Sequence, residues 1–167
     1  IFCVHGGLSP LLKDLDQIRS IERPTEVPEE GLLKDLLWSD PDPDADEWAD
    51  SPRGASFTFT AKAIDEFLRR FGFRYIIRAH QAVSNGFQFP MGNETILTLF
   101  SCPKYCGCYD NDGAYLVLDE NLNPELAVMK PYNEEEDDEF ENNHNAPGTP
   151  PRGKKLESYM DYTLIDE

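Results

Sequence analysis

Basic residues are scarce in this sequence of 167 residues, which has 15 lysines and arginines against 32 aspartates and glutamates. The formal net charge at pH 7 is therefore −17. Proteins bind the phosphate backbone of nucleic acids through clusters of lysine and arginine, so this charge argues against a nucleic-acid partner. The excess is largest at the C-terminal end, where residues 132–167 hold 11 acidic and 3 basic side chains.

Long apolar runs are also missing. No stretch approaches the roughly 20 apolar residues that a membrane-spanning helix needs, and no secretory signal is visible. We therefore expect no membrane partner, no secretion, and a location in the cytoplasm or nucleus. Because Ile1 is not a methionine and begins an apolar run, we expect the chain to be a fragment cut inside a larger domain.

Cysteine is infrequent, and three of the four cysteines lie close together, at Cys102, Cys106 and Cys108. Without a secretion signal, a disulfide framework is not expected. A zinc knuckle would need a fourth ligand at a suitable spacing, and none is near. The sequence therefore predicts reduced thiols, with a thiol-rich redox or zinc module as a less favoured alternative.

Hydrophobic periodicity predicts a mixed α/β fold. Helical spacing is found in residues 12–21, 32–38 and 60–72. Strand-like runs are found in residues 1–5, 56–59, 74–80, 86–90, 94–101, 114–120 and 125–131. Short turns separate the last five runs, which is typical of an antiparallel sheet.

Two segments have compositions that disfavour regular structure. Residues 41–54 are rich in proline and aspartate, so we expect a surface loop there. After residue 131 the sequence becomes acidic, polar and proline-rich. We therefore expect one folded domain over residues 1–131 and a disordered tail over residues 132–167.

Two histidines each end an apolar strand-like run, His5 in IFCVH and His80 in RYIIRAH. A lone histidine at a strand end is more often a hydrogen-bonded structural residue than a ligand. If the two strands are neighbours, however, both imidazoles emerge at one edge of the sheet, where they can bind zinc, manganese or iron. Gly6 and Gly7 follow His5 and would let the backbone pass close to a neighbour. No carboxylate partner is obvious nearby, so further ligands would come from residues outside this chain.

Arg53 and Tyr105 are further candidates, each with an alternative explanation. The guanidinium of Arg53, in SPRGASF, is a planar donor suited to phosphate oxygens. The alternative is a solvated loop arginine that pairs with nearby aspartates. Tyr105 lies in a loop beside Cys106 and Gly107, where an aromatic ring either covers a pocket or simply packs.

Five ordered segments resemble the C-terminal half of the phosphoprotein phosphatase catalytic domain, the serine/threonine family that includes types 1, 2A and 2B. They are HGGLSP (5–10), LLWSDPD (36–42), RGASFTF (53–59), RAHQ (78–81) and SCPKYCGCYDNDGA (101–114). The resemblance covers residues 1–131 and is strongest to the type-1 enzymes. It implies a calcineurin-like metallophosphoesterase fold, a two-sheet sandwich flanked by helices, of which only the C-terminal half is present.

The resemblance also implies roles for individual residues. His5 and His80 would be ligands of one of two divalent metal ions, either manganese or iron and zinc, and the other ion's ligands would lie outside this chain. Arg53 would bind the substrate phosphate, and Asp40 would lie close to the metal centre. Arg53 and Asp40 are expected to act in catalysis together with Tyr105, which would overhang the active site.

Three regulatory features follow from the same resemblance. Cys106 would be the attachment point of microcystin-type toxins. Thr149, followed by Pro150, resembles a proline-directed kinase site whose phosphothreonine would compete with substrate for the active site. Regulatory subunits are expected as partners.

Some type-1 partners dock through an RVxF-type segment in an apolar channel. Ile1, Phe89 and Leu122 match this channel, whereas Asn123 and Pro124 do not match its edge strand. Proline removes a backbone donor from the edge, which disfavours strand addition. The sequence leaves open whether such a segment binds.

The implied activity is the metal-dependent hydrolysis of phosphoserine and phosphothreonine in protein substrates, by direct attack of metal-bound water. We expect the isolated fragment to be inactive, because the family's other metal-binding motifs are not in this sequence. The alternative is a catalytically dead pseudo-phosphatase that acts as an interaction module. Retention of His5, His80, Arg53 and Tyr105 argues against it.

Overall fold

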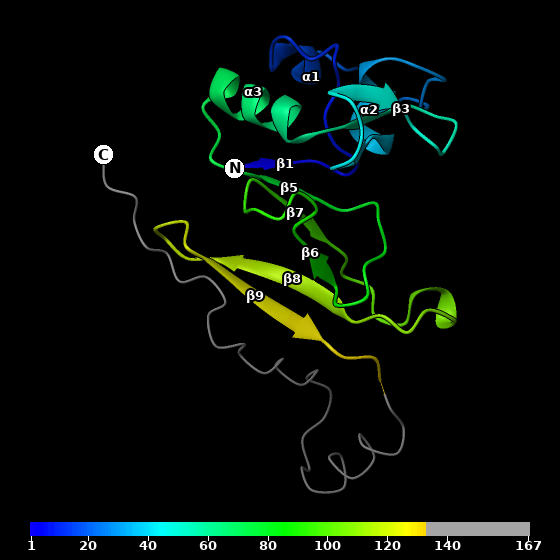
Figure 1. Ribbon diagram of the computed structural model, residues 1–167, viewed down its shortest axis with the longest axis vertical. Coiled ribbons are helices and arrows are strands. Elements are labelled where there is room, and N and C mark those ends of the chain that lie inside the picture. The colour runs from blue at the N-terminus through cyan, green and yellow to red at the C-terminus, as the bar shows by residue number, and fades with distance from the viewer. Residues whose placement is uncertain (133–167) are drawn as a thin grey trace, which may run out of the picture. The chain divides into compact units, whose positions relative to one another are not determined.

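The computed structural model describes residues 1–132 and contains two compact units (Figure 1). The first unit holds residues 1–82 and 87–99, and the second holds residues 83–86 and the chain from residue 100 onward. Both units contain strands, and the first also contains three helices, so the predicted α/β composition is confirmed. The predicted tail over residues 132–167 falls, apart from Tyr132, outside the described residues.

A four-stranded sheet lies in the first unit, in the order β1-β5-β7-β6. Its strands are β1 (Phe2–Cys3), β5 (Ile76–Arg78), β7 (Ile96–Leu99) and β6 (Phe87–Gln88). β1, β5 and β7 run parallel, and only β6 is antiparallel to its neighbour. The expectation of an antiparallel sheet is therefore wrong here. Residues 79–95 are long enough to return the chain to the same end of the sheet before β7 begins.

A smaller sheet in the same unit has the order β2-β4-β3. Its strands are β2 (Asp40–Pro41), β4 (Phe57–Phe59) and β3 (Trp48–Asp50). β2 is parallel and β3 antiparallel to β4. The predicted loop over residues 41–54 thus contains a strand. Trp48 explains the difference, because its ring packs 5.9 Å from the ring of Phe59 and ties the acidic segment to the core.

The helices of the first unit are α1 (Asp16–Arg19), α2 (Leu32–Trp38) and α3 (Ala61–Phe71). α2 has the predicted bounds, whereas α1 is much shorter than predicted. α3 begins after Thr60 and ends at Gly72, which adopts the left-handed conformation with φ 70°.

The hydrophobic core of the first unit joins both sheets to the helices. Its buried members are Phe2, Leu8, Leu12, Leu36, Phe59, Ala63, Ile64, Phe67, Leu68, Ile76 and Ile96. Because β1, β2, β4 and β5 each contribute to or flank this core, the segments that follow these strands are held in fixed positions.

The second unit is built on an antiparallel hairpin of β8 (Gly113–Leu118) and β9 (Pro124–Met129) (Figure 1). A short 3-10 turn, η1 (Tyr105–Gly107), precedes the hairpin. Backbone hydrogen bonds connect Phe100 to Gly86 and to Ala114, which joins the two chain segments of this unit.

Candidate active site

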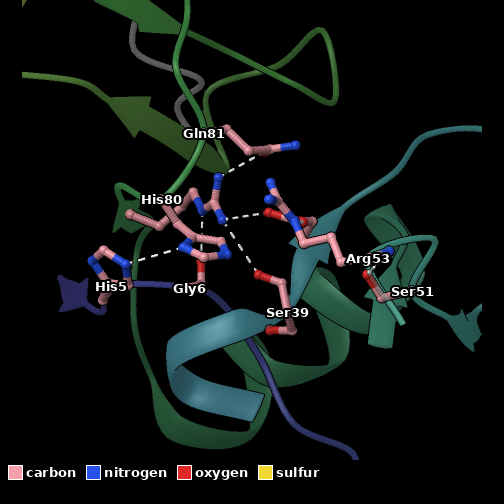
Figure 2. Close-up of polar contacts among 9 residues, drawn as sticks. His5, Gly6, Ser39, Ser51, Arg53, His80 and Gln81 are labelled. Atoms are coloured by element: carbon pink, nitrogen blue, oxygen red, sulfur yellow. Dashed lines mark hydrogen bonds and ion pairs between the residues drawn. The ribbon is translucent and has the colours of Figure 1, made fainter. Parts of the chain in front are cut away.

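The two histidines predicted as metal ligands are adjacent in the structure (Figure 2). Nε2 of His5 lies 3.0 Å from Nδ1 of His80. The parallel pairing of β1 and β5 causes this approach, because Phe2 is the register partner of Ile76 and Cys3 of Ile77. The amide of Ala79 donates to the carbonyl of His5 and continues the ladder past the strand ends.

The two glycines after His5 are explained by close packing, Gly6 against α2 and Gly7 against Phe59 of β4. A Cβ on Gly6 would lie 2.5 Å from the carbonyl carbon of Leu37, and a Cβ on Gly7 would lie 2.4 Å from the ring of Phe59. The amide of Gly6 also donates to the carbonyl of Leu36. The backbone at Gly6 therefore lies directly against the C-terminal end of α2, a close approach of the kind expected from the two glycines, although the sequence did not identify the neighbour.

His80 has an unusual backbone conformation and a partly buried ring. Its φ of 65° is in the left-handed region, which is uncommon for a residue other than glycine and is typical of functional sites. Burial lowers the pKa of His80 to about 4, and the positive charges of Arg53 and Arg78 act in the same direction against the opposing effect of Asp40. The imidazole is therefore neutral near pH 7, which is the form that binds metals.

Asp40 connects two arginines at the centre of the site. Its Oδ1 accepts from Nη2 of Arg78 at 2.7 Å, and its Oδ2 accepts from Nε of Arg53 at 2.5 Å. The carboxylate is almost completely buried, and the side chain of Arg78 is fully buried. Burial lowers the pKa of Arg78 to about 10, so this guanidinium remains charged at neutral pH.

Arg53 is the more exposed of the two arginines, with 37% of its side chain accessible. It lies in the loop between β3 and β4, where its amide donates to Oγ of Ser51. Only Nε of its guanidinium has a partner among residues 1–132, namely Asp40. Both terminal nitrogens are thus available to bind the oxygens of a phosphate group.

The donor set of the histidine pair fits part of a metal site. Two nitrogens bound at about 2.1 Å to one cation, with a right angle between them, lie about 3 Å apart. Nε2 of His5 and Nδ1 of His80 have this separation. No cluster of three or more potential ligands was found among the described residues. The two imidazoles therefore need additional ligands from elsewhere to complete a site.

Tyr105 and Cys106 lie in the second unit, in a loop with a strained backbone. Cys106 has a φ of 54°, and all four cysteines of the chain are free and exposed. The ring of Tyr105 packs 5.0 Å from that of Phe100. The side chain of Asn111 accepts from the amide of Tyr105 at 2.9 Å and donates to the carbonyl of Cys102 at 2.8 Å.

The remaining sequence-predicted positions are distributed over the chain. Ile1 and Phe89 of the predicted docking channel belong to the first unit, and Leu122, which is exposed, belongs to the second. Pro124 pairs with Leu118 at the start of β9. Thr149 lies outside the described residues. No helix in the described part of the chain has the length and apolar character to cross a membrane.

Arg78 and Gln81 were not identified as site residues from the sequence. Nη1 of Arg78 donates to Oε1 of Gln81 at 2.7 Å. The segment RYIIRAH contained a pattern that indicates a buried arginine, because strand periodicity puts Arg78 on the same face as Ile76, which is buried. A charged residue on the buried face of a strand needs internal partners.

The sequence model of the calcineurin-like phosphoesterase family matches residues 1–84, just over half of the chain. The chain therefore belongs to the calcineurin-like phosphoesterase family, and the predicted calcineurin-like fold is confirmed.

One similar solved structure is described as a protein serine/threonine phosphatase from Saccharomyces cerevisiae with similarity to human phosphatase PP5. The sequence identity is 28% and the TM-score is 0.68. The match covers 78% of this chain and 44% of that chain, so this chain spans less than half of its length. The predicted resemblance to serine/threonine phosphatases is thereby confirmed, while its type-1 character stays a prediction.

Proposed function

We propose that these residues form part of the active site of a metal-dependent protein serine/threonine phosphatase. The observation that carries this proposal is the convergence of His5, His80 and Arg53. The two imidazoles are 3.0 Å apart, and Arg53 binds Asp40, the carboxylate that also binds Arg78, two residues before His80. A pair of metal-binding nitrogens next to a guanidinium fits a phosphate ester that is bound by a cation and an arginine together.

Arg53 would bind the phosphate group of the substrate. Asp40 engages its Nε, and the two terminal nitrogens of this partly exposed side chain have no hydrogen-bond partner among residues 1–132. The guanidinium can therefore donate two parallel hydrogen bonds to phosphate oxygens. It would also offset the negative charge that develops on the phosphate during hydrolysis.

His5 and His80 would hold a divalent cation through Nε2 and Nδ1 respectively. When bound, such a cation supplies Lewis-acid chemistry that activates water and offsets charge on the phosphate. The strand pairing of β1 and β5 keeps both rings in place before the cation arrives. A preorganised pair of ligands reduces the entropy that metal binding must overcome.

Phosphate release from a phosphoserine or phosphothreonine peptide by the intact protein tests this proposal. We expect turnover that disappears on treatment with a chelator and returns with a divalent cation. Arg53→Lys should lower kcat/KM by about 100-fold, because an ammonium cannot make the bidentate contact. Arg70→Lys, an exposed arginine on α3 paired with Glu66, is the matched control and should retain activity.

The outcome also distinguishes the alternative of an inactive interaction module. A protein that binds the phosphopeptide with a cation present, yet releases no phosphate, would be a pseudo-phosphatase. Equal turnover by the Arg53→Lys variant would contradict the assigned role of Arg53. Faster release from a phosphotyrosine peptide than from the phosphoserine peptide would contradict the proposed specificity.

A further inference from the structure

Arg78 has no role in the proposed function, yet its side chain makes four hydrogen bonds to segments that carry residues of the proposed active site. It is the last residue of β5, and its side chain is fully buried. Its Nε donates to the carbonyl of Gly6 at 2.6 Å, and its Nη1 donates to Oε1 of Gln81 at 2.7 Å. Its Nη2 donates to Oδ1 of Asp40 at 2.7 Å and to the carbonyl of Ser39 at 3.3 Å (Figure 2).

Each acceptor of Arg78 is next to, or in contact with, a residue of the proposed active site. Gly6 follows His5, and Gln81 follows His80. Asp40 contacts Arg53 directly, through its other carboxylate oxygen. One guanidinium therefore connects both strand ends that carry the histidines to the carboxylate that orients the exposed arginine.

We propose that Arg78 is a positioning residue that acts through Asp40 to orient Arg53 for phosphate, and through Gly6 to fix the backbone beside His5. This inference rests on the proposed function, since it assumes that Arg53 binds phosphate. Arg78 itself does not contact substrate, because its side chain has no accessible surface.

The shape of the guanidinium explains why an arginine occupies this position. Its planar set of donors reaches acceptors in three directions at once, whereas the ammonium of lysine is a compact point charge. Lysine at this position would keep the charge opposite Asp40 and would lose the simultaneous contacts with Gly6 and Gln81. Arg78→Lys therefore separates positioning from simple charge neutralisation.

The inhibition constant of inorganic phosphate, measured with the intact protein, provides the first test. Arg78→Lys should weaken phosphate inhibition by about tenfold, the loss expected when one charge-assisted hydrogen bond is misaligned. Arg53→Lys should weaken it at least as much. In the double variant, Arg78→Lys should add less than about twofold to the effect of Arg53→Lys, because both substitutions remove the same interaction.

A control separates positioning from loss of stability. Ile64→Val, a substitution of a fully buried core residue on α3, should lower the midpoint of thermal unfolding and leave the inhibition constant of phosphate unchanged. An Arg78→Lys effect of the same size in the wild-type and Arg53→Lys backgrounds would overturn the inference. So would an Arg78→Lys variant with wild-type phosphate inhibition, where Arg53→Lys does weaken that inhibition.

A spectroscopic readout tests the inference independently of catalysis. The Nε–H of Arg53 is hydrogen-bonded to Asp40, so its NMR signal should be shifted and should exchange slowly with solvent. Arg78→Lys should move this signal toward that of an exposed arginine and speed its exchange. If the signal responds but neither arginine variant affects phosphate inhibition, the proposed function fails and the structural coupling stands. An unchanged signal overturns the inference, whatever the kinetics show.

Gln81→Ala provides a second variant if Arg78→Lys does not fold. It removes one acceptor of the Arg78 guanidinium at a partly exposed position and leaves the ion pair with Asp40 intact. We expect phosphate inhibition to weaken by about two- to threefold, the effect of one hydrogen bond at the low end of the usual range. This loss should disappear in the Arg53→Lys background, and persistence of the loss would overturn the inference.

Discussion

Nε2 of His5 lies 3.0 Å from Nδ1 of His80, although 75 positions separate the two residues in the sequence. Each histidine follows its strand by two residues, and the strands are parallel neighbours in one sheet. Sheet register pairs Cys3 with Ile77, so His5 lies two residues and His80 three residues beyond the same paired position, and both follow the strands at the same edge of the sheet. The histidine pair is therefore a direct consequence of sheet register, and it is the basis of the proposed metal site.

Asp40→Asn should destabilise the protein, because it leaves the buried charge of Arg78 without its counter-charge. The expected decrease in the free energy of unfolding is about 3 kcal/mol, measured by urea denaturation of the intact protein near neutral pH. Glu66→Gln removes a carboxylate from the exposed ion pair with Arg70 and should cost less than about 0.5 kcal/mol. Similar losses for the two variants would contradict a buried network around Asp40.

Gly6→Ala should weaken cation binding by displacing the backbone beside His5. The added Cβ would lie 2.5 Å from the carbonyl carbon of Leu37 and 2.6 Å from the nitrogen of Trp38, so backbone must move. We expect a decrease in Mn²⁺ affinity of about tenfold, measured by calorimetry. Gly92→Ala is the control: its added Cβ meets no heavy atom within 4 Å, and the strain at its left-handed φ of 69° lies outside the proposed site, so Mn²⁺ affinity should stay unchanged. Unchanged affinity in Gly6→Ala would show that the histidine pair tolerates this movement.

Asn111→Ala should loosen the loop that carries Tyr105 and Cys106. The side chain of Asn111 accepts from the amide of Tyr105 and donates to the carbonyls of Cys102 and Asp112. Its removal leaves these groups unsatisfied, so the amide of Tyr105 should exchange with solvent at least about tenfold faster. The Cys106 thiol should also react faster with an alkylating reagent.

Asn121→Ala is the matched control for this substitution. Asn121 is exposed, and its backbone amide rather than its side chain donates to Oδ1 of Asp119. Exchange at Tyr105 should match the wild type in this variant. Equal protection in Asn111→Ala and the wild type would contradict the assigned role of Asn111.

Asp119 should make the β8–β9 turn sensitive to acid. Hydrogen bonds from the amide and side chain of Asn123, and from the amide of Asn121, lower the pKa of Asp119 below its ordinary value. Because the folded pKa is below the unfolded one, the stabilisation is fully present above about pH 4 and decreases as the pH falls through the folded value.

NMR chemical shifts of the Asn121 and Asn123 amides, followed from about pH 6 to about pH 2, measure this transition. Their midpoint should lie below the ordinary aspartate pKa, and Asp119→Asn should abolish it. A midpoint at or above the ordinary value would contradict the hydrogen bonding at this turn.

The sequence predicted the local elements better than their pairing. The helix over residues 32–38 and the extent of α3 follow from hydrophobic periodicity, which is a local signal. The direction of β7 relative to β5 depends on where the chain travels between the strands. Short connections alone do not specify that path.

In the candidate site, too, the residues were predictable from local patterns, whereas the contacts between distant segments were not. His5 and His80 were identifiable because each ends an apolar strand, and Arg53 because it lies in a recognisable motif. The network around Arg78 was not identifiable, because its four acceptors lie up to 72 positions away from it in the sequence. A charge on the buried face of a strand indicates that partners exist, and only the fold shows which they are.

Relaxation of the ³¹P NMR signal of inorganic phosphate, with Mn²⁺ bound to the intact protein, tests the central claim most directly. If His5 and His80 hold a cation beside the phosphate-binding Arg53, bound Mn²⁺ should broaden the phosphate signal strongly at low phosphate concentration. Arg53→Lys should shift this broadening to higher phosphate concentration, and His80→Asn should reduce it together with Mn²⁺ binding. A protein that binds Mn²⁺ and leaves the phosphate signal sharp would contradict the account.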